Sequence, residues 1–354
     1  MNLYIHIGIY KSGSSFLQHV CATQRQVLLN QGIYFPVSIE DPKMCKGLIS
    51  KGNADGLEQA LKKEDNQKIR TILMTWLNKA RVEGVHNVLI SAESLVHLFA
   101  IQSKIDLLTK IARAIGFNQL HIMGFFRDLA EHALSTYKHR AKSGKHEDYI
   151  NWIKNEYETP ELLKSLHSVV TSNSLNLNWT FRKFQKNSRL LIEGFFVDWI
   201  GIEAPNVQNK PIVNQSVTAS ELKMLHHLKL CYPFVQDFFV DDFKKIPLDR
   251  KADDKSWTDF LKGTFTNYLN KHEKDLNKLN LFFPVNESLS IGNHQDASAV
   301  IDEPVIQLSD YQISVMMRRI RFFESFFGKS IIVRRIFWHR LNTIIHIILR
   351  HEKL

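Results

Sequence analysis

The chain has 354 residues, of which 44% are hydrophobic and 23% charged, so it can bury a large core and has the composition of an ordinary globular protein. Its three cysteines, Cys21, Cys45 and Cys231, are scattered, which argues against a disulfide framework and a cysteine-based metal site and favours a reducing, cytoplasmic location. The net charge of +10 is concentrated near the C-terminus, and the low charge of the first 310 residues argues against a broad nucleic-acid-binding surface.

A short apolar strand is predicted at residues 3–7, and it runs directly into a turn rich in glycine and serine. Because the chain opens in a core strand, no signal peptide is expected. Residues 8–15 have the spacing of a Walker A phosphate-binding loop except at one position. Ser14 stands where the Walker lysine would be, and the lysine is Lys11, inside the loop.

A helix is predicted after this turn, with apolar residues on one side as far as Leu28 and with Gly32 at its end. The unpaired amides at the start of such a helix favour an anion. Residues 41–67 are polar and are expected to form a loop with a short helix. A further strand is predicted at residues 88–90, and Glu93 follows its end.

Residues 120–126 form another apolar run, predicted to be a buried strand that ends at Arg127-Asp128 and is followed by a helix over residues 130–143. In open parallel sheets, ligands bind beyond the carboxyl ends of the strands, and Lys11 and Arg127 both fall at such ends. An arginine can bind phosphate through two charge-assisted hydrogen bonds. Alone, however, Arg127-Asp128 also fits a surface ion pair. Ser135 lies about two helical turns further on and could donate to the same phosphate.

The later elements are a predicted strand at residues 188–193 and a polar loop at residues 209–216 that contains Lys210. The expected fold is therefore α/β, with a central parallel sheet flanked by helices. A polar stretch at residues 286–303 indicates a boundary. The predicted division is a domain at residues 1–290, a linker at 291–310 and a tail at 311–354.

The tail carries nine Lys or Arg and two Glu, a net charge of +7. Residues 331–350 alternate basic and bulky apolar side chains at helical spacing, as in an amphipathic helix that lies on an anionic membrane surface. Charges interrupt this stretch too often for it to span a bilayer. Packing on the rest of the chain and pairing of two subunits are the alternatives, and the oligomeric state stays open.

Residues 6–18 read His-Ile-Gly-Ile-Tyr-Lys-Ser-Gly-Ser-Ser-Phe-Leu-Gln, which resembles the 5′-phosphosulfate loop of sulfotransferases that use 3′-phosphoadenosine 5′-phosphosulfate (PAPS). The family's usual form is Pro-Lys-[Ser/Thr]-Gly-Thr-Thr, so Tyr10 replaces the proline and two serines replace the threonines. Arg127, Ser135 and Tyr137 resemble its 3′-phosphate motif, in which Leu129 replaces a usual proline. The resemblance covers roughly residues 1–290, with strong motifs only at these two places.

The resemblance implies a P-loop-like fold and transfer of a sulfuryl group from PAPS to an acceptor hydroxyl, by default on a carbohydrate, glycolipid or polysaccharide, without a metal. It assigns Lys11 to the leaving phosphate. The implied nucleotide-binding residues are Lys11, Ser12, Gly13, Ser14 and Ser15 for the 5′-phosphosulfate, and Arg127, Ser135 and Lys210 for the 3′-phosphate. A solvated loop lysine is the alternative for Lys210.

Three residues are candidates for the general base that accepts the proton of the acceptor. Glu93 is the first, because relatives of this type often carry Ser-x-Glu at this strand end. A structural carboxylate that accepts from loop amides is the alternative role for it. His6 is the second candidate, although a core histidine in a strand is the commoner case. His97, one helical turn after Glu93, is the third.

Two other classes of protein stay open. A nucleotide kinase or another P-loop NTPase would share the loop, but Ser14 replaces its lysine and neither later strand ends in a clear Walker B aspartate. A non-catalytic protein that binds a membrane through its basic tail is the second alternative.

Overall fold

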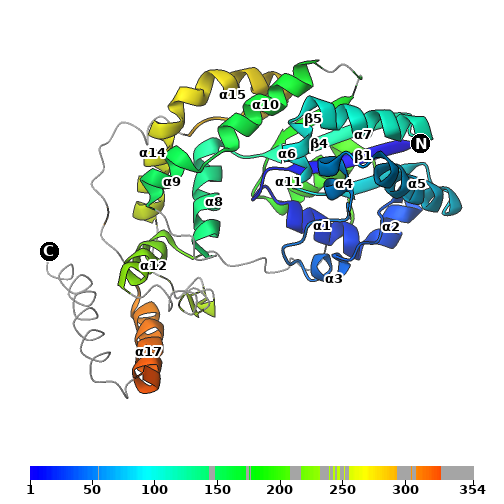
Figure 1. The fold of residues 1–354 in the computed structure, drawn as a ribbon. Coiled ribbons are helices and arrows are strands. Elements are labelled where there is room, and N and C mark those ends of the chain that lie inside the picture. The colour runs from blue at the N-terminus through cyan, green and yellow to red at the C-terminus, as the bar shows by residue number, and fades with distance from the viewer. Residues whose placement is uncertain are drawn as a thin grey trace. The chain divides into compact units, whose positions relative to one another are not determined.

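The computed structural model of the chain (Figure 1) divides into two compact units of interleaved segments. The first comprises Met1–His132, Glu158–Val213 and Leu269–Ile291, and the second comprises Ala133–Tyr157, Asn214–Tyr268 and Gly292–Leu354. The structure describes residues 1–54, 56–142, 148–172, 175, 177–207, 217–231, 239, 242–243, 245–247, 251, 255–292, 304 and 308–327.

The first unit is built on a five-stranded sheet in the order β2-β3-β1-β4-β5, and every pair of neighbours is parallel. The strands are β1 (Asn2–Gly8), β2 (Ile33–Tyr34), β3 (Asn87–Ser91), β4 (Gln119–Phe126) and β5 (Asn178–Lys183). Strand β1 is central and almost wholly buried, because its apolar residues face helices on both sides. The predicted α/β class with a central parallel sheet is confirmed.

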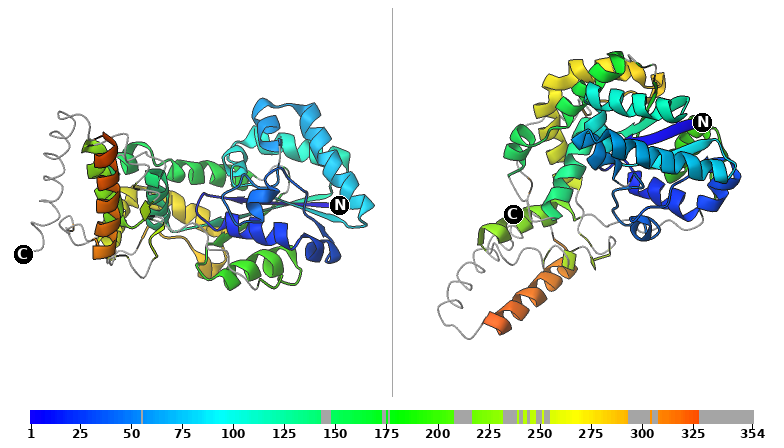
Figure 2. Two further views of the ribbon diagram at one scale, coloured as in Figure 1. Left: turned by 90° about the horizontal axis from the view of Figure 1, so that it is seen from below. Right: turned by 45° about the vertical axis from the view of Figure 1, so that its right-hand side comes forward.

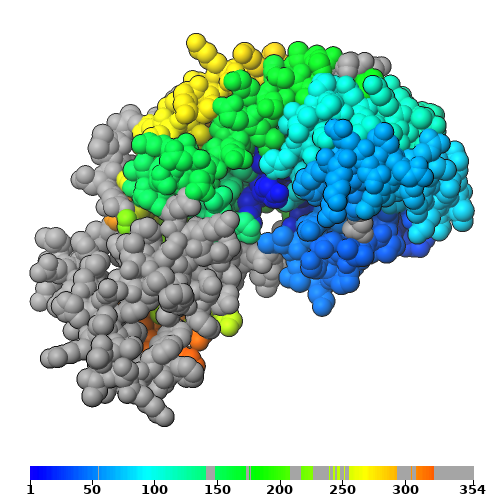
Figure 3. All heavy atoms as spheres, in the orientation of Figure 1, coloured from blue at the N-terminus to red at the C-terminus, as the bar shows by residue number. Residues whose placement is uncertain are grey.

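Helices cover both faces of this sheet, as Figure 2 shows in its left panel. On one face, the apolar sides of α1 and of the π-helical segment η1 pack on Tyr4, Leu89 and Met123 of the sheet. In Figure 3 the side chains of α4 and α5 form part of the outer surface of this unit. The helical elements of the first unit are α1 (Ser14–Thr23), α2 (Arg25–Asn30), α3 (Asp41–Met44), α4 (Leu57–Lys63), α5 (Asn66–Val82), α6 (Leu95–Phe99), α7 (Gln102–Ile115), α10 (Thr159–Ser172), α11 (Ser188–Ile192), η1 (Glu193–Ile200), η3 (Asn270–His272), α15 (Glu273–Leu279), η4 (Asn280–Phe282) and η5 (Val285–Glu287).

The described part of the second unit is helical. Helix α8 (Leu129–Lys142) belongs to the first unit up to His132 and to the second from Ala133 onward. The others are α9 (Tyr149–Asn155), α12 (Ala219–Cys231), α14 (Lys255–Leu269) and α17 (Asp310–Phe327). Buried Glu221 accepts hydrogen bonds from Lys251 Nζ at 3.0 Å and from Gln312 Nε2 at 2.7 Å, so its charge is paired inside this unit.

Two local predictions differ from the structure. The predicted strand at residues 188–193 is wrong, because this segment forms α11 and the start of η1. The side chain of Asn187 accepts a hydrogen bond from the amide of Arg189 and caps that helix. The predicted single helix after the loop is broken at Gln24, whose φ of −105° ends α1, and Gly32 follows α2 with a φ of +83°.

Only the first part of the basic tail lies among the described residues. Helix α17 places Met316 and Ile320 in the core, and Arg319 forms a two-pronged ion pair with Asp242 at 2.6 and 2.7 Å. This part of the tail therefore packs within its own unit. The predicted amphipathic helix at residues 331–350, and most of the predicted linker at 291–310, lie outside the described residues. No described helix is long and apolar enough to cross a membrane.

Candidate functional site

The glycine- and serine-rich loop leaves the carboxyl end of β1 and is held by two hydrogen bonds. The Ser12 hydroxyl donates to the carbonyl oxygen of Ile9, which closes the loop on itself. His132 Nε2 donates to the carbonyl oxygen of Tyr10 at 2.8 Å, which ties the loop to α8. Lys11 adopts a left-handed backbone conformation with a φ of +70°, which is unusual for a residue with a side chain.

Two glycines of the loop are required by close approach. A Cβ atom at Gly8 would lie 2.8 Å from Ser14 Oγ and 3.2 Å from Ser12 Oγ. Gly13 has a φ of +88°, and a Cβ atom there would lie 2.8 Å from carbon atoms of Phe184 and Leu191. A side chain at Gly8 would therefore displace the two serine side chains of the loop, and one at Gly13 would displace the loop from Phe184 and Leu191.

Helix α1 begins at Ser14, and its first amides point out of the helix. The amides of Phe16 and Leu17 bond to the carbonyl oxygen of Gly13, whereas those of Ser14 and Ser15 have no backbone acceptor among the described residues. The Ser14 hydroxyl is buried and likewise lacks a hydrogen-bond partner. These donors lie at the N-terminus of α1, where the helix dipole favours negative charge, so the loop is suited to an anion.

Lys11 and Glu93 are charged groups of this cradle that interact with one another. Burial raises the pKa of the Glu93 carboxyl to about 6, while the Ser14 hydroxyl and the Lys11 ammonium group act in the opposite direction. The Ser14 hydroxyl is near enough to affect this pKa but does not reach the geometry of a full hydrogen bond. Burial lowers the pKa of Lys11, Glu93 raises it, and the positive charge of Arg127 lowers it further.

Arg127 follows β4 and is not paired with its neighbour Asp128. Asp128 instead accepts from Lys183 Nζ at 2.9 Å and from the amide of Ser290 at 2.7 Å. The Arg127 guanidinium carbon lies 4.1 Å from the centroid of the Phe184 ring. Its buried Nε has no hydrogen-bond partner within the described part of the chain. The alternative that Arg127-Asp128 is a surface ion pair is therefore wrong, and the half-buried Arg127 keeps a buried Nε–H group that could donate to an anion.

The two histidine candidates lie in different environments. His6 is buried in β1, with its ring edge-on to those of Phe125 and Phe195, and its Nδ1 lies 2.8 Å from Ser91 Oγ. Burial lowers the pKa of His6 to about 3. His97 is exposed, and its ring centroid lies 5.9 Å from that of Tyr10. Although the side chain reaches solvent, partial desolvation by its neighbours lowers the pKa of His97, and the charge of Glu158 acts in the opposite direction.

Most of the predicted site residues thus gather at the carboxyl ends of three neighbouring strands. These residues are His6, Lys11, Ser12, Gly13, Ser14, Ser15, Glu93 and Arg127. Ser135 lies on α8 in the second unit, so its pairing with Arg127 stays a prediction, and Lys210 lies outside the described residues. Tyr137 is a core residue of the second unit, with ring centroids 5.3 Å from Trp152 and 6.1 Å from Phe265.

Two contributors to the site were not predicted from the sequence. His132 anchors the loop, and Phe184 lies beneath Arg127 and against Gly13. His132 lies in α8 and Phe184 directly follows β5, so both are far along the chain from the loop that they contact. Neither is part of a recognisable sequence motif. The only available signal is their position just after the carboxyl ends of β4 and β5, where parallel sheets build their sites.

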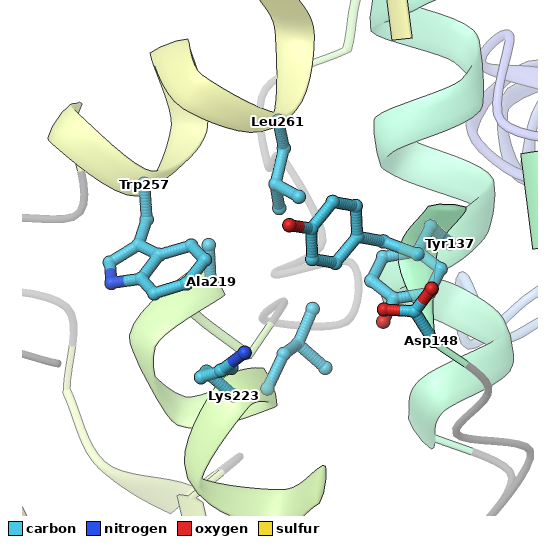
Figure 4. A pocket seen from close by; sticks show the side chains of 8 residues that line it. Tyr137, Asp148, Ala219, Lys223, Trp257 and Leu261 are labelled. Carbon is cyan, nitrogen blue, oxygen red and sulfur yellow. The ribbon is translucent and has the colours of Figure 1, made fainter. Parts of the chain in front are cut away.

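A separate cavity in the second unit is shown in Figure 4, where Tyr137, Trp257, Leu261 and Lys223 point toward one another. Its volume is about 30 Å³, which has room for a water molecule but not for a nucleotide. Asp148, which also lines it, caps α9 by accepting from two amides at 3.1 Å. The loop of the first unit is therefore the stronger candidate for a functional site.

Comparison with protein-family models, with curated proteins and with solved structures finds no match to this chain. The chemistry of the site must therefore be inferred from its own groups. Amides, hydroxyls, an ammonium group and a guanidinium group are all hydrogen-bond donors or cations, which suit the oxygen atoms of phosphate and sulfate. Within the described ranges, no three His, Cys, Asp or Glu side chains are arranged to bind a metal ion.

Proposed function

We propose that this chain is a sulfotransferase that moves a sulfuryl group from PAPS to an acceptor hydroxyl. The observation that carries the proposal is the presence of two cations, Lys11 and Arg127, beyond the ends of the adjacent strands β1 and β4. Two separate cationic positions suit a nucleotide with phosphate groups at both its 5′ and 3′ positions. The resemblance of both segments to the phosphate-binding motifs of PAPS-dependent sulfotransferases supports the same conclusion.

The buried donors give a test of whether PAPS fits. Ser14 Oγ and Arg127 Nε are both buried and have no partner among the described residues, which is costly unless a ligand supplies acceptors. Ser14, Ser15 and the rest of the loop would hold the 5′-phosphosulfate, and Arg127 would hold the 3′-phosphate. Ser135 and Lys210 are proposed to assist Arg127. PAPS supplies the activated sulfuryl group, which leaves 3′-phosphoadenosine 5′-phosphate behind.

The roles of the charged residues follow from where charge develops. Lys11 stabilises the negative charge that forms on the leaving phosphate, since a preorganised cation contributes most where charge appears in the transition state. Glu93 accepts the proton that the acceptor hydroxyl loses, and a pKa of about 6 leaves it mostly ionised at neutral pH. The proposed acceptor is a hydroxyl of a carbohydrate, glycolipid or polysaccharide, an assignment that rests on the family resemblance.

We further propose a cytoplasmic enzyme held at the inner membrane surface by residues 311–354, whose net charge is +7. Co-sedimentation with vesicles of anionic lipid tests this part. A variant with Arg334, Arg335 and Arg340 changed to Glu should remain in the supernatant. Equal sedimentation of the variant and the natural chain would remove the membrane role and leave the catalytic proposal intact.

Ligand-induced stabilisation of the full chain tests the catalytic proposal. 3′-Phosphoadenosine 5′-phosphate at 100 times its Kd should stabilise the fold by about 2.7 kcal/mol, whereas ATP with magnesium should not. Transfer of radioactive sulfate from PAPS to a panel of oligosaccharides then tests turnover. If ATP with magnesium stabilises the chain and the bisphosphate does not, the loop serves a nucleotide kinase or NTPase, and the sulfotransferase proposal is wrong.

A further inference from the structure

A chain of hydrogen bonds runs from partly buried Ser50 through Gln18 and Ser91 to buried His6. The Ser50 hydroxyl accepts from the amide of Gly52 at 3.3 Å, so its own hydrogen is free to donate to Gln18 Oε1 at 2.7 Å. Gln18 Nε2 lies 3.4 Å from the carbonyl oxygen of Ser91, which can only accept. Both contacts fix the Gln18 amide in the same orientation, with its NH₂ group toward Ser91.

This orientation determines the hydrogen on Ser91. Gln18 Nε2 donates to Ser91 Oγ at 3.3 Å, and Ser91 Oγ lies 2.8 Å from His6 Nδ1. The Ser91 hydroxyl has one hydrogen to donate. Among the described residues, His6 Nδ1 is the acceptor that lies within hydrogen-bond distance of it. If Nδ1 carried the proton instead, the Ser91 hydrogen and the lone pair of His6 Nε2 would both be buried without partners. His6 is therefore the tautomer with its proton on Nε2.

Nε2 of His6 lies near Gly8, at the start of the loop. His6 Nε2 is buried and has no hydrogen-bond partner in the described structure. A Cβ atom placed on Gly8 would lie 3.9 Å from this nitrogen and 2.8 Å from Ser14 Oγ, which also lacks a partner. Two unsatisfied polar groups thus lie within 4 Å of one point beside Gly8, where the loop begins.

We propose that His6 is a neutral hydrogen-bond donor of the anion site, held in one tautomer by Ser50, Gln18 and Ser91, with its Nε2–H directed at an oxygen of the bound phosphate group. This inference rests on the proposed phosphate site and replaces the role of His6 as a general base. The surroundings agree, because Phe125 and Phe195 enclose the ring and disfavour a charged imidazolium. His6 is a positioning residue, since it would hold the nucleotide and take no proton from the acceptor.

Nitrogen NMR of the full chain labelled in histidine tests the tautomer without any ligand. The His6 signals are assigned as those lost in a His6→Gln variant. They should show a neutral ring with the proton on Nε2 from pH 5 to pH 8. Addition of inorganic pyrophosphate should shift the Nε2–H signal. A proton on Nδ1, a transition near pH 6, or an unchanged signal with pyrophosphate bound would each overturn the inference.

Two variants separate the donor from the ring. In His6→Gln the amide nitrogen falls near the position of Nε2, whereas in His6→Asn it falls near that of Nδ1. Pyrophosphate affinity should fall about tenfold in His6→Asn, as expected for loss of a hydrogen bond to a charged group, and less than threefold in His6→Gln. Circular dichroism checks that both variants are folded. If neither folds, the NMR experiment on the natural chain decides.

The outcomes also separate this inference from the proposed function. If pyrophosphate shifts the His6 signal but 3′-phosphoadenosine 5′-phosphate does not bind, His6 is a donor in an anion site of another kind, and the sulfotransferase proposal fails. If the bisphosphate binds with the His6 signal unchanged, the inference fails and the proposed function stands. Equal pyrophosphate affinity of the natural chain and both folded variants would also overturn the inference.

Discussion

Arg127 lies over the ring of Phe184, with its guanidinium carbon 4.1 Å from the ring centroid. One face of the guanidinium group is therefore covered by carbon, while its buried Nε has no hydrogen-bond partner in the described part of the chain. A cation over an aromatic face gains about 0.5–2 kcal/mol, depending on how far water is excluded. Phe184 thus fixes the plane of Arg127 and leaves its edge for a ligand.

The first prediction separates the charge of Arg127 from its shape. Arg127→Lys keeps the charge but loses the planar fork and the stacked face, so affinity for 3′-phosphoadenosine 5′-phosphate should fall about tenfold. Phe184→Leu keeps the arginine but frees its plane, and the loss should be about threefold. Isothermal titration calorimetry measures both. Affinity for pyrophosphate, which lacks a 3′-phosphate, is the control and should stay within twofold.

The second prediction uses the left-handed backbone of Lys11. Its φ of +70° costs a residue with a Cβ atom about 1 kcal/mol and costs glycine very little. Lys11→Gly should therefore be about 1 kcal/mol more stable to urea than Lys11→Ala. Both variants lose the ammonium group, and both should lose sulfuryl transfer while largely keeping nucleotide binding. Unchanged turnover in either would remove Lys11 from the chemistry, and equal stability would contradict its backbone conformation.

The parts of the fold that the sequence predicted are those encoded locally. Residues 3–15 carry a strand, a loop and a helix start within one stretch, and the apolar run before Arg127 ends where β4 ends. Short apolar segments are ambiguous, because periodicity alone does not separate a buried strand from a buried helix turn. Residues 188–193 were predicted to be a strand for that reason, and the Asn187 cap decides for a helix.

Strand β5 lies next to β4 at one edge of the sheet and was not predicted from the sequence. Strand β5 reads Asn-Trp-Thr-Phe-Arg-Lys, and of its residues only Phe181 is fully buried. An edge strand half-open to solvent carries no continuous apolar run. The two unpredicted site residues, His132 and Phe184, share this difficulty, since each acts on a loop more than 100 residues away in the chain. Only the assembled sheet brings them there.

The third prediction concerns pH. Burial raises the folded-state pKa of Glu93 to about 6 from an ordinary value of 4.5, so the folded protein holds this proton more tightly than the unfolded chain. The stability linked to this group is fully present below pH 4.5 and is lost as the pH rises through 6. Glu93→Gln cannot ionise, so its free energy of unfolding relative to the natural chain should rise by about 2 kcal/mol between pH 4 and pH 8.

Chemical denaturation at several pH values measures that difference, and Glu83→Gln, an exposed acid, is the control, which should show no such rise. Activity should respond in the opposite direction. Because the proposed base must be ionised, transfer by the natural chain should increase as the pH rises through about 6. A rate that is flat from pH 5 to pH 8 would contradict the role of Glu93 as the base, and a flat stability difference would contradict its raised pKa.

The fourth prediction tests the segment that holds the end of β3. Gly52 has a φ of +85°, and a Cβ atom there would lie 1.8 Å from the carbonyl oxygen of Ser91. The next residue, Asn53, donates its backbone amide to that oxygen at 3.1 Å. Its side-chain Oδ1 accepts from the backbone amide of Ser91 at 2.7 Å. Gly84 has a φ of +70° but open space around its Cβ position, which makes it a matched control.

Gly84→Ala should cost only the backbone strain, about 1 kcal/mol, while Gly52→Ala should cost on the order of 3 kcal/mol because Ser91 must also move. Movement of Ser91 releases its hydrogen bond to His6, so Gly52→Ala should weaken pyrophosphate binding as well, and Gly84→Ala should not. Urea denaturation and calorimetry of the two variants measure both effects. If the two variants lose the same free energy of unfolding, the backbone of Ser91 can move at no energetic cost. Unchanged pyrophosphate binding in a destabilised Gly52→Ala variant would show that Ser91 does not control the anion site.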